Sequence, residues 1–516
     1  MQVETQTDQI AERLEDLLPA EVSGPLLSRR RWLLGGGLAG AILDRAPNAQ
    51  AGGGLPERHA LDDQAPRQES PELKLIRRIT MGLNEEELER MDRLGYQAYL
   101  EYHLDHEAID DDEVEADLDE YYLTLNRPVY NYRHWNRNLL ITELIQATIF
   151  RSVHSKKQLL QRMVEFWTDH FNIELVKDPV YSLKTVDDRA VIRPNALGTF
   201  PDILRASVKS PAMLVYLDNN TNLRGSPNEN YARELLELHT LGVDGGYREA
   251  DVVEFARCLT GWGTSLRADH SYGSFEFRVD QHDRGVKYVM GLEIYNFRNW
   301  ERDVEEVVDF LVDHPSTMRF IALKMCRWMW GYEPPESLVD DVADIYAATG
   351  GDIRAMLRRI LARRSMIDAP PKLKRPYHLI VSAIRTINGS VAPRGAQWVW
   401  RNALSTTGQI PYYWGPPDGY PDTIEHWIGN PLARWNILGN LASGNGQVTF
   451  LVREVFDGAE TPEEIADRLD YLLHGGEMPA SEKQALVEYM EPGPPNTRRK
   501  LEALGLAMSA PTYQLY

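Results

Sequence analysis

Apolar residues recur at intervals of three and four along most of this 516-residue chain, which is the spacing of a helix with one buried face. The segments in which this spacing is clearest are 73–83, 85–104, 137–150, 157–171, 230–242 and 307–315. So many helical segments predict a mainly α protein, in which one large domain is built like a multi-helix bundle.

Capping residues predict further helices near the C-terminus. Thr461-Pro462-Glu463-Glu464 is a capping box with proline at the first helical position, and Gly475-Gly476 is expected to end the helix that it begins. Ser481 to Gln484 repeats the capping pattern. We therefore expect a C-terminal helical part over about residues 450–516.

The strand signal is short. Residues 274–279 and 286–290 have strand character, and a turn over 280–285 would join them into one small β-hairpin. Residues 397–431 are rich in Trp, Tyr, Gly and Pro and show no period. A loop of this length inside a compact domain is usually functional, or it covers a site.

The N-terminus has the three parts of a secretory signal. Arg29-Arg30-Arg31 precedes a short apolar stretch, Trp32 to Leu43, and the small-residue triplet Ala49-Gln50-Ala51 follows. Paired arginines before a glycine-rich stretch are typical of twin-arginine export. The stretch is a dozen residues long, whereas a membrane span needs about 20, so we expect cleavage and no remaining transmembrane segment.

These features predict the division of the chain and its location. Residues 1–51 would be the signal peptide, 52–72 a flexible linker and 73–516 a single large helical domain. The mature protein would be periplasmic or secreted.

The charge balance argues against nucleic acid as a partner. The chain has 56 Lys and Arg against 77 Asp and Glu, a net charge of −21, and removal of residues 1–51 leaves −19. Binding to phosphate backbones needs clustered Lys and Arg. The two cysteines, Cys258 and Cys326, lie in apolar helical patterns and are interpreted as buried free thiols, with a disulfide as the alternative.

Two histidines are candidate catalytic or metal-binding residues. His170 and His239 each fall on the apolar face of a predicted helix. If the two helices face each other, the pair could bind a metal ion or act as an acid and base; alternatively, each is a core histidine bonded to a backbone carbonyl. Glu234 lies at the edge of the same face, about 140° from His239 in α-helical geometry.

The loop before that helix has oxygen side chains at the spacing of a calcium loop. They are Asp218, Asn220, Asn222, Ser226 and Glu229. The sixth position of a calcium loop needs glycine and is Leu223 here. The alternative is a loop whose Asp and Asn side chains cap the following helix.

Two further segments contain candidate site residues. His282-Asp283 could orient a general base or bind metal, or could be a charged turn. The loop after residue 408 combines rings with carboxylates, which suits a sugar, although the rings could equally be packing groups. Its candidate residues are Tyr412, Tyr413, Trp414, Tyr420, Asp418 and Asp422.

The order of several longer motifs resembles the bacterial family called domain of unknown function 1800, from about Leu73 to the C-terminus. The motifs are FWTDHFNIE, IRPNALGTF, PAMLVYLDNN, PNENYARELLELHTLGV, LTGW, HDRGVKYVMG, HPSTMRFIALK and GQIPYYWGPPDGYPD. The resemblance implies export, often by the twin-arginine route, and genes beside a family with a sulfatase-like fold. It implies no catalytic residues.

Two functional hypotheses follow. The first is an exported hydrolase of an extracytoplasmic or envelope polymer, with a site that uses carboxylates and histidines or a divalent metal, calcium or a transition metal. His170 and His239 would form this site, and the segment Tyr412 to Asp422 would roof it. The second is a non-catalytic protein that binds a glycan or a protein, or assembles with an exported sulfatase-like partner.

Overall fold

The computed structural model describes residues 69–444 and 448–516. The predicted signal peptide and most of the predicted linker lie outside these residues. The first described helix, α4 (Pro71–Ile79), begins two residues before the predicted domain start, and Ser70 caps it by accepting a hydrogen bond from the Leu73 amide at 3.3 Å.

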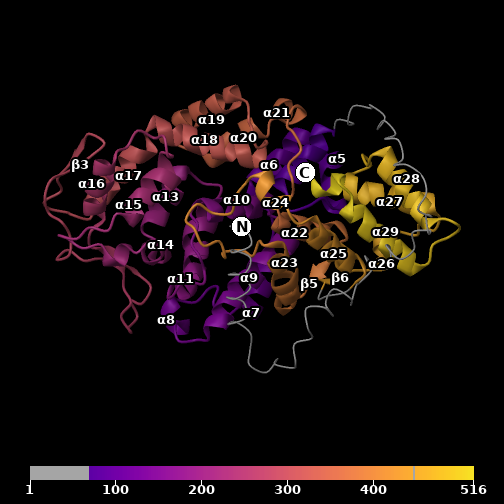
Figure 1. Cartoon of the computed structure of the whole chain (residues 1–516), viewed down its shortest axis with the longest axis horizontal. Coiled ribbons are helices and arrows are strands. Elements are labelled where there is room, and N and C mark those ends of the chain that lie inside the picture. The colour runs from indigo at the N-terminus through magenta and orange to yellow at the C-terminus, as the bar shows by residue number, and fades with distance from the viewer. Residues whose placement is uncertain (1–68, 445–447) are drawn as a thin grey trace, which may run out of the picture.

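The described residues are mainly helical, as predicted, and form an elongated body (Figure 1). The first helices after α4 are α5 (Glu85–Leu94), α6 (Tyr96–Leu104), α7 (Asp112–Tyr121), α8 (Val129–Tyr132), α9 (Arg137–His154), α10 (Gln158–His170), α11 (Val180–Asp187), α12 (Arg193–Asn195), α13 (Phe200–Val208) and α14 (Pro211–Tyr216). The next are α15 (Asn230–Glu234), α16 (Glu249–Leu259), α17 (Arg302–Val312), α18 (Pro315–Met329), α19 (Glu336–Thr349), α20 (Ile353–Ile360), α21 (Arg363–Ile367) and α22 (Pro376–Thr386). The last are α23 (Ser405–Thr407), α24 (Ile424–Trp427), α25 (Pro431–Ala442), α26 (Val452–Phe456), α27 (Pro462–His474), α28 (Ala480–Met490) and α29 (Thr497–Ser509).

Three π-helical turns continue or precede α-helices. They are η3 (Asp188–Ile192), η5 (Leu235–Thr240) and η7 (Val399–Leu404). Short 3₁₀ turns are η2 (His106–Ala108), η4 (Asn219–Thr221), η6 (Pro393–Gly395) and η8 (Thr512–Gln514). π-helical turns are rare and occur frequently at functional sites.

The helical predictions from sequence are confirmed, with changes at the ends. The segment 85–104 is two helices, because Gly95 takes a positive φ of 74° between α5 and α6. The capping box at Thr461 begins α27, which Gly475 ends in the left-handed region. The next helix, α28, begins at Ala480, so Ser481 lies inside the helix and does not cap it.

The predicted strands exist, but their predicted pairing is wrong. Within residues 69–444 and 448–516, six strands form three antiparallel pairs: β1 (Trp262–Thr264) with β2 (Phe275–Phe277), β3 (Lys287–Val289) with β4 (Leu292–Ile294), and β5 (Ser390–Val391) with β6 (Val448–Thr449). The segment 280–285 does not form a hairpin turn because its His282 side chain is fully buried and donates from Nδ1 to the Thr260 carbonyl at 2.7 Å.

The described residues contain two large hydrophobic cores. One core takes in α4–α6, α10–α20 and strands β1, β3 and β4, and the other takes in α9, α22, α25 and α27–α29. In Figure 1, β3 with α15–α17 and α26–α29 mark the two ends of the body, and α9, α10 and α22 lie between them. Helices α9 and α10 therefore bring the two cores together.

The segment rich in Trp, Tyr, Gly and Pro, residues 397–431, contains η7, α23 and α24. The stretch between α23 and α24, residues 408–423, lies against the end of α10. The Asn172 amide donates to the carbonyls of Trp414 at 2.9 Å and Pro416 at 2.6 Å. The Tyr412 carbonyl accepts from the Leu175 amide at 2.8 Å. We call residues 408–423 the covering loop.

The predictions about the cysteines and about membrane-spanning helices both concern buried or apolar segments. Cys258 and Cys326 are buried free thiols, as predicted. Burial raises the pKa of both thiols, to about 12 for Cys326. Within residues 69–444 and 448–516, no helix has the length and apolarity that a membrane crossing needs.

Gly419 should be required for the covering loop to lie on α10. Its φ is 77°, and a Cβ atom there would overlap the Asp169 backbone carbonyl. We expect Gly419→Ala to lower the free energy of unfolding by about 2–5 kcal/mol, since the left-handed conformation and the overlap both cost energy. Urea denaturation measures the loss.

Gly408→Ala is the matched control. Gly408 also has a positive φ, 86°, but a Cβ atom there meets no atom within 4 Å. It should lose only about 1–2 kcal/mol. Equal losses in the two variants would contradict a close contact between the covering loop and α10.

Candidate functional site

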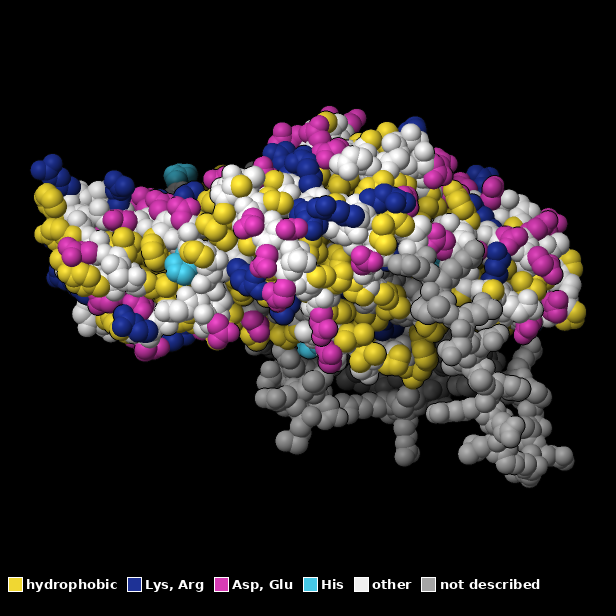
Figure 2. Space-filling model, turned by 90° about the horizontal axis from the view of Figure 1, so that it is seen from above, with side chains coloured by type: hydrophobic (Ala, Val, Ile, Leu, Met, Phe, Trp, Pro, Cys, Tyr) yellow, Lys and Arg dark blue, Asp and Glu magenta, His cyan; other side chains and the backbone are white. Residues whose placement is uncertain are grey.

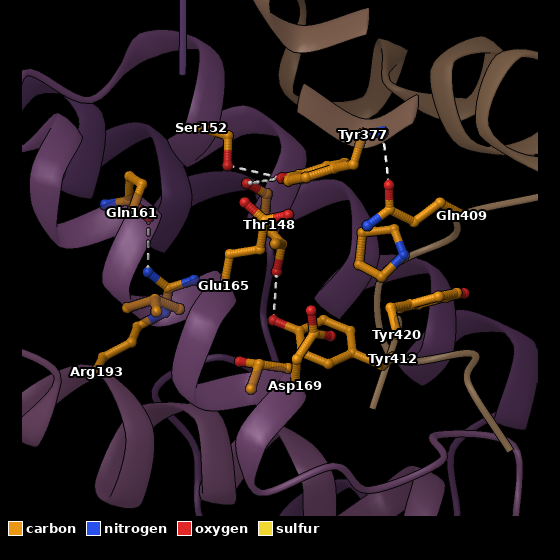
Figure 3. A pocket seen from close by; sticks show the side chains of 13 residues that line it. Thr148, Ser152, Gln161, Glu165, Asp169, Arg193, Tyr377, Gln409, Tyr412 and Tyr420 are labelled. Carbon is orange, nitrogen blue, oxygen red and sulfur yellow. Dashed lines mark hydrogen bonds between the residues drawn. The ribbon is translucent and has the colours of Figure 1, made fainter. Parts of the chain in front are cut away.

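A cavity lies at the junction of the two cores, between α9, α10, α22 and the covering loop (Figure 3). About 40 Å³ of it is open to the centres of water molecules, which is room for roughly three waters or one small functional group. Its lining is mostly polar and aromatic side chains, although both neighbouring cores are apolar. A cavity between two packed units, with several polar groups pointing together, is a common setting for a ligand site.

Two carboxylates stand on the wall that α10 forms. Glu165 and Asp169 are four residues apart and share one helix face. Arg375 contacts both: its Nη1 donates to Asp169 Oδ2 at 2.7 Å and its Nη2 donates to Glu165 Oε1. The other oxygen of Glu165 accepts from Arg162 Nη1 at 2.8 Å. Glu165 is therefore held between two guanidinium groups.

Asp169 holds its proton more tightly than an ordinary aspartate. Burial, reinforced by the charge of Glu165, raises the pKa of Asp169 to about 6 in spite of the opposing charge of Arg375. Its side chain is 19% exposed, so solvent and small molecules can reach it. A largely buried carboxyl group with a pKa near 6 can both donate and accept a proton near neutral pH.

Two tyrosines form the opposite wall. The Tyr412 hydroxyl lies 2.8 Å from Thr148 Oγ1 and donates to Asp188 Oδ1 at 3.2 Å, and the Tyr377 hydroxyl lies 2.7 Å from Ser152 Oγ. Burial raises the pKa of both tyrosines, so both hydroxyl groups stay neutral. Tyr412 has a positive φ of 67°, a strained conformation that this loop imposes on it.

Arg193 enters the cavity from the end of the π-helical turn η3 (Figure 3). Its Nε donates to Asp188 Oδ2 at 2.6 Å, and its Nη1 donates to Gln161 Oε1 at 3.0 Å. The π turn adds a residue to the helical repeat, which changes the face on which the following side chains lie. Asp188 and Arg193 thereby reach α10 and the covering loop together.

The predicted histidine pair lies beside this cavity and does not line it. The rings of His170 and His239 are 6.0 Å apart between centroids, so the two helices do face each other. His170 Nε2 lies 3.2 Å from the His239 carbonyl, and rings of Phe166, Trp167 and Phe171 surround it. Burial lowers the pKa of both histidines, to about 3 for His239, so both are neutral.

No third ligand accompanies the pair. Among the described residues, no three His, Cys, Asp or Glu side chains are grouped closely enough to hold a metal ion. The arrangement of His170 fits the alternative of a core histidine bonded to a backbone carbonyl.

Glu234 and Asp418 are not among the residues that line the cavity. Burial and the charges of Glu237 and Asp418 raise the pKa of Glu234. Asp418 is exposed and accepts a hydrogen bond from Trp414 Nε1 at 2.7 Å. Helix α15 ends at Glu234, and His239 lies in the π turn η5 that follows it. The angle of about 140° between Glu234 and His239, which was calculated for an α-helix, therefore does not apply.

His282 and Asp283 point in different directions. His282 Nε2 lies 3.1 Å from Asp303 Oδ2, and Lys287 Nζ donates to the same oxygen at 2.5 Å, all three side chains being fully buried. Burial favours the neutral acid, but these hydrogen bonds lower the pKa of Asp303. Asp283 instead pairs with Arg257, at 3.0 Å between Oδ2 and Nε. The pair is thus split between a buried network and a surface ion pair.

The oxygen side chains of the suggested calcium loop are bound to separate groups. Asp218 pairs with Lys177 at 2.8 Å, and Asn220 accepts from the Thr264 amide at 2.6 Å. Asn222 accepts from the Asn228 amide at 2.9 Å, and Glu229 lies 3.5 Å from Arg233. These contacts hold the loop to its neighbours, which is the alternative interpretation of the pattern.

The rings of the covering loop are largely buried. Tyr412 and Tyr420 line the cavity, whereas Tyr413 and Trp414 pack elsewhere, and none of the four is more than 9% exposed. Asp422 pairs with the buried Lys372 at 2.7 Å. The loop therefore contributes Gln409, Pro411, Tyr412 and Tyr420 to the cavity lining, and its buried rings form no open aromatic platform.

Sequence reasoning missed the charged residues of the cavity. Glu165 and Asp169 lie in the helix predicted over 157–171, and their spacing of four was a usable signal. Their partner Arg375 is 206 residues from Asp169 along the chain, so no local pattern could connect them. Arg193 was hidden because the π turn before it cannot be read from apolar spacing.

The buried network of His282, Lys287 and Asp303 should stabilise the fold. Asp303→Ala removes the carboxylate that pairs with Lys287 and leaves a buried cation unpaired, so we expect a loss of about 3–5 kcal/mol in the free energy of unfolding. Asp309→Ala is the control on the same helix, since Asp309 is 60% exposed and its pair with Arg205 should contribute about 1 kcal/mol or less. Similar losses in urea denaturation would show that the network is not a stabilising one.

The comparisons with known proteins identify the family. The model of the family described as Protein of unknown function (DUF1800) matches residues 74–515, which include all residues that line the cavity. Comparison with curated proteins gives no match, and neither does comparison with solved structures. The chain therefore belongs to the family described as Protein of unknown function (DUF1800).

Proposed function

We propose that this protein is an exported hydrolase of an extracytoplasmic or envelope polymer, with Asp169 as its general acid and base. The observation that carries the proposal is the largely buried Asp169 carboxyl group, whose pKa is about 6, at the edge of a cavity between two cores. No other described carboxyl group combines such a raised pKa with a place in that cavity. The export signal predicted from sequence for residues 1–51 supports the location.

The chemistry needs one proton carrier and one water molecule. Neutral Asp169 donates its proton to the leaving oxygen as the bond between that oxygen and the attacked carbon breaks. Water adds to the carbon, and its proton restores neutral Asp169. Glu165, bound by Arg162 and Arg375, carries the second negative charge of the site and stabilises positive charge that develops on the substrate.

The cavity admits only part of a polymer. Its volume of about 40 Å³ matches one functional group. The rim residues Glu165, Thr168 and Asp169 are partly exposed, so the rest of a chain would lie outside the body. Hydrolysis would then take place where one group of the substrate enters.

The pH dependence of hydrolysis tests the role of Asp169. The groups that face it are Glu165 on its own helix, Arg375 before α22, Lys324 on α18 and Tyr420 of the covering loop. Because the donating form is the neutral acid, kcat/KM should fall as the pH rises through about 6. Asp169→Asn should lower kcat/KM by about 100-fold or more. Methyl glycosides and alkyl esters, whose leaving oxygens need a proton, provide the measurement when they are assayed across the pH range.

Stability gives a second measurement on the same variant. Since folding raises the pKa of Asp169, this group stabilises the fold most below its unfolded pKa, and the contribution is lost as the pH rises through about 6. Asp169→Asn should remove that part of the pH dependence of unfolding. Asp92→Asn, at an exposed position on α5, should leave both profiles unchanged. A wild-type profile in Asp169→Asn would exclude the proposed role.

A second candidate function, non-catalytic binding of a glycan, is supported by exposed rings at the end of the body that contains β3 and β4. Tyr288, Tyr295 and Phe297, on and after the β3–β4 pair, are each more than half exposed, and the rings of Tyr295 and Phe297 stack at 5.9 Å. Figure 2 shows hydrophobic side chains at this end beside Lys and Arg, and mixed charges elsewhere on that face. Such rings suit the apolar faces of sugars.

The Tyr295→Ala and Phe297→Ala double variant tests this second function. It should bind a soluble polysaccharide about tenfold more weakly in affinity electrophoresis, because each stacked ring contributes about 0.5–1.5 kcal/mol. Trp435→Ala, at a 46% exposed ring on α25, is the control. Unchanged migration of the double variant would remove these rings from any role in binding.

A further inference from the structure

Two hydrogen-bond donors in the Asp169 cavity have no partner among the described residues. Arg193 uses its Nε and Nη1 atoms on Asp188 and Gln161, but its Nη2 atom is buried and unbonded. Thr168 Oγ1, on α10 between Glu165 and Asp169, is also buried and unbonded. Both residues line the cavity. Buried donors without partners are costly, so the cavity is suited to a ligand that accepts hydrogen bonds.

The charges around the cavity favour an anionic acceptor. Three guanidinium groups, those of Arg162, Arg193 and Arg375, face the carboxylates of Glu165, Asp169 and Asp188. When Asp169 carries its proton, as a general acid must, three positive charges face two negative ones. A ligand with one negative charge then restores the balance.

The shape of the donors and the size of the cavity favour a carboxylate among the possible anionic groups. A guanidinium edge matches the two oxygens of a carboxylate, and a threonine hydroxyl can donate to one of them. A space with room for roughly three water molecules holds the three heavy atoms of a carboxylate group.

We propose that the Asp169 cavity binds a carboxylate group of the substrate, with Arg193 Nη2 and Thr168 Oγ1 as its hydrogen-bond donors. This inference rests on the proposed hydrolase and specifies its substrate class: a polymer whose units carry carboxylates. Arg193 and Thr168 are then specificity-determining residues, and Asp169 beside them acts on the bond next to the bound group.

Acetate and acetamide form a matched pair of probes, because they have the same size and differ in charge. Binding of each, labelled with carbon-13, is measured by NMR titration with the purified protein near pH 5. A ligand of four heavy atoms can reach only modest affinity, so we expect a millimolar dissociation constant for acetate and at least tenfold weaker binding of acetamide. Hydrolysis plays no part in this measurement, so it stands or fails separately from the proposed activity.

Thr168→Val is the decisive variant. It removes only the unbonded hydroxyl group, so the protein should stay folded, and acetate should bind about tenfold more weakly because a hydrogen bond to a charged group is lost. Arg193→Gln should weaken acetate binding further. Thr317→Val is the matched control, since Thr317 Oγ1 is also buried and unbonded but lies outside the cavity lining.

Three results would overturn the inference. They are equal binding of acetate and acetamide, no binding of acetate, and full acetate affinity in Thr168→Val. If acetate binds as expected but Asp169→Asn hydrolyses every substrate normally, the carboxylate site stands and the proposed catalytic role of Asp169 fails.

Discussion

The Arg375 guanidinium group connects the two halves of the molecule. It stands at the N-cap of α22, within the second core, and contacts Glu165 and Asp169 on α10, within the first. The Arg375 side chain is only 3% exposed. A cation buried in this way is tolerated only when its carboxylate partners are in place. The ion pairs therefore fix α22 relative to α10, and with them the width of the cavity that these helices enclose.

The same ion pairs explain why charged side chains line part of the cavity. Burying Asp169 beside Glu165 brings two like charges together in a poorly solvated place, and Arg375, the one guanidinium group that contacts Asp169 directly, offsets only part of that cost because it also binds Glu165. The remaining cost appears as a raised pKa for Asp169. Replacement of such buried ion pairs by well-packed apolar residues is often neutral or stabilising, so the stability of the fold does not by itself explain this charged junction.

The sequence predicts the helices and much less of the site. Apolar spacing locates α9, α10 and the helix that begins at Asn230, because the buried face of a helix repeats along the chain. It places His170 and His239 each on an apolar helix face, and the structure shows that the two faces meet, with the rings 6.0 Å apart. It cannot find η3 and η5, because a π turn changes the repeat itself, nor can it pair Asp169 with a partner as distant as Arg375. Nor does a local pattern reveal that β2 pairs with β1 across a loop, or that His282 is buried against the Thr260 carbonyl.

The covering loop closes one side of the cavity and fixes the positions of the side chains that line it. Tyr412 is held at a positive φ, and Gly419 lies so close to the Asp169 carbonyl that no side chain fits between them. A loop free to move would relax Tyr412 toward an ordinary conformation and withdraw its hydroxyl group from Asp188. Asp188 would then lose one of the donors that orient it toward Arg193. The position of the Arg193 guanidinium group, and so the direction of its unbonded Nη2 atom, depends on a contact that the loop makes with the far side of the cavity.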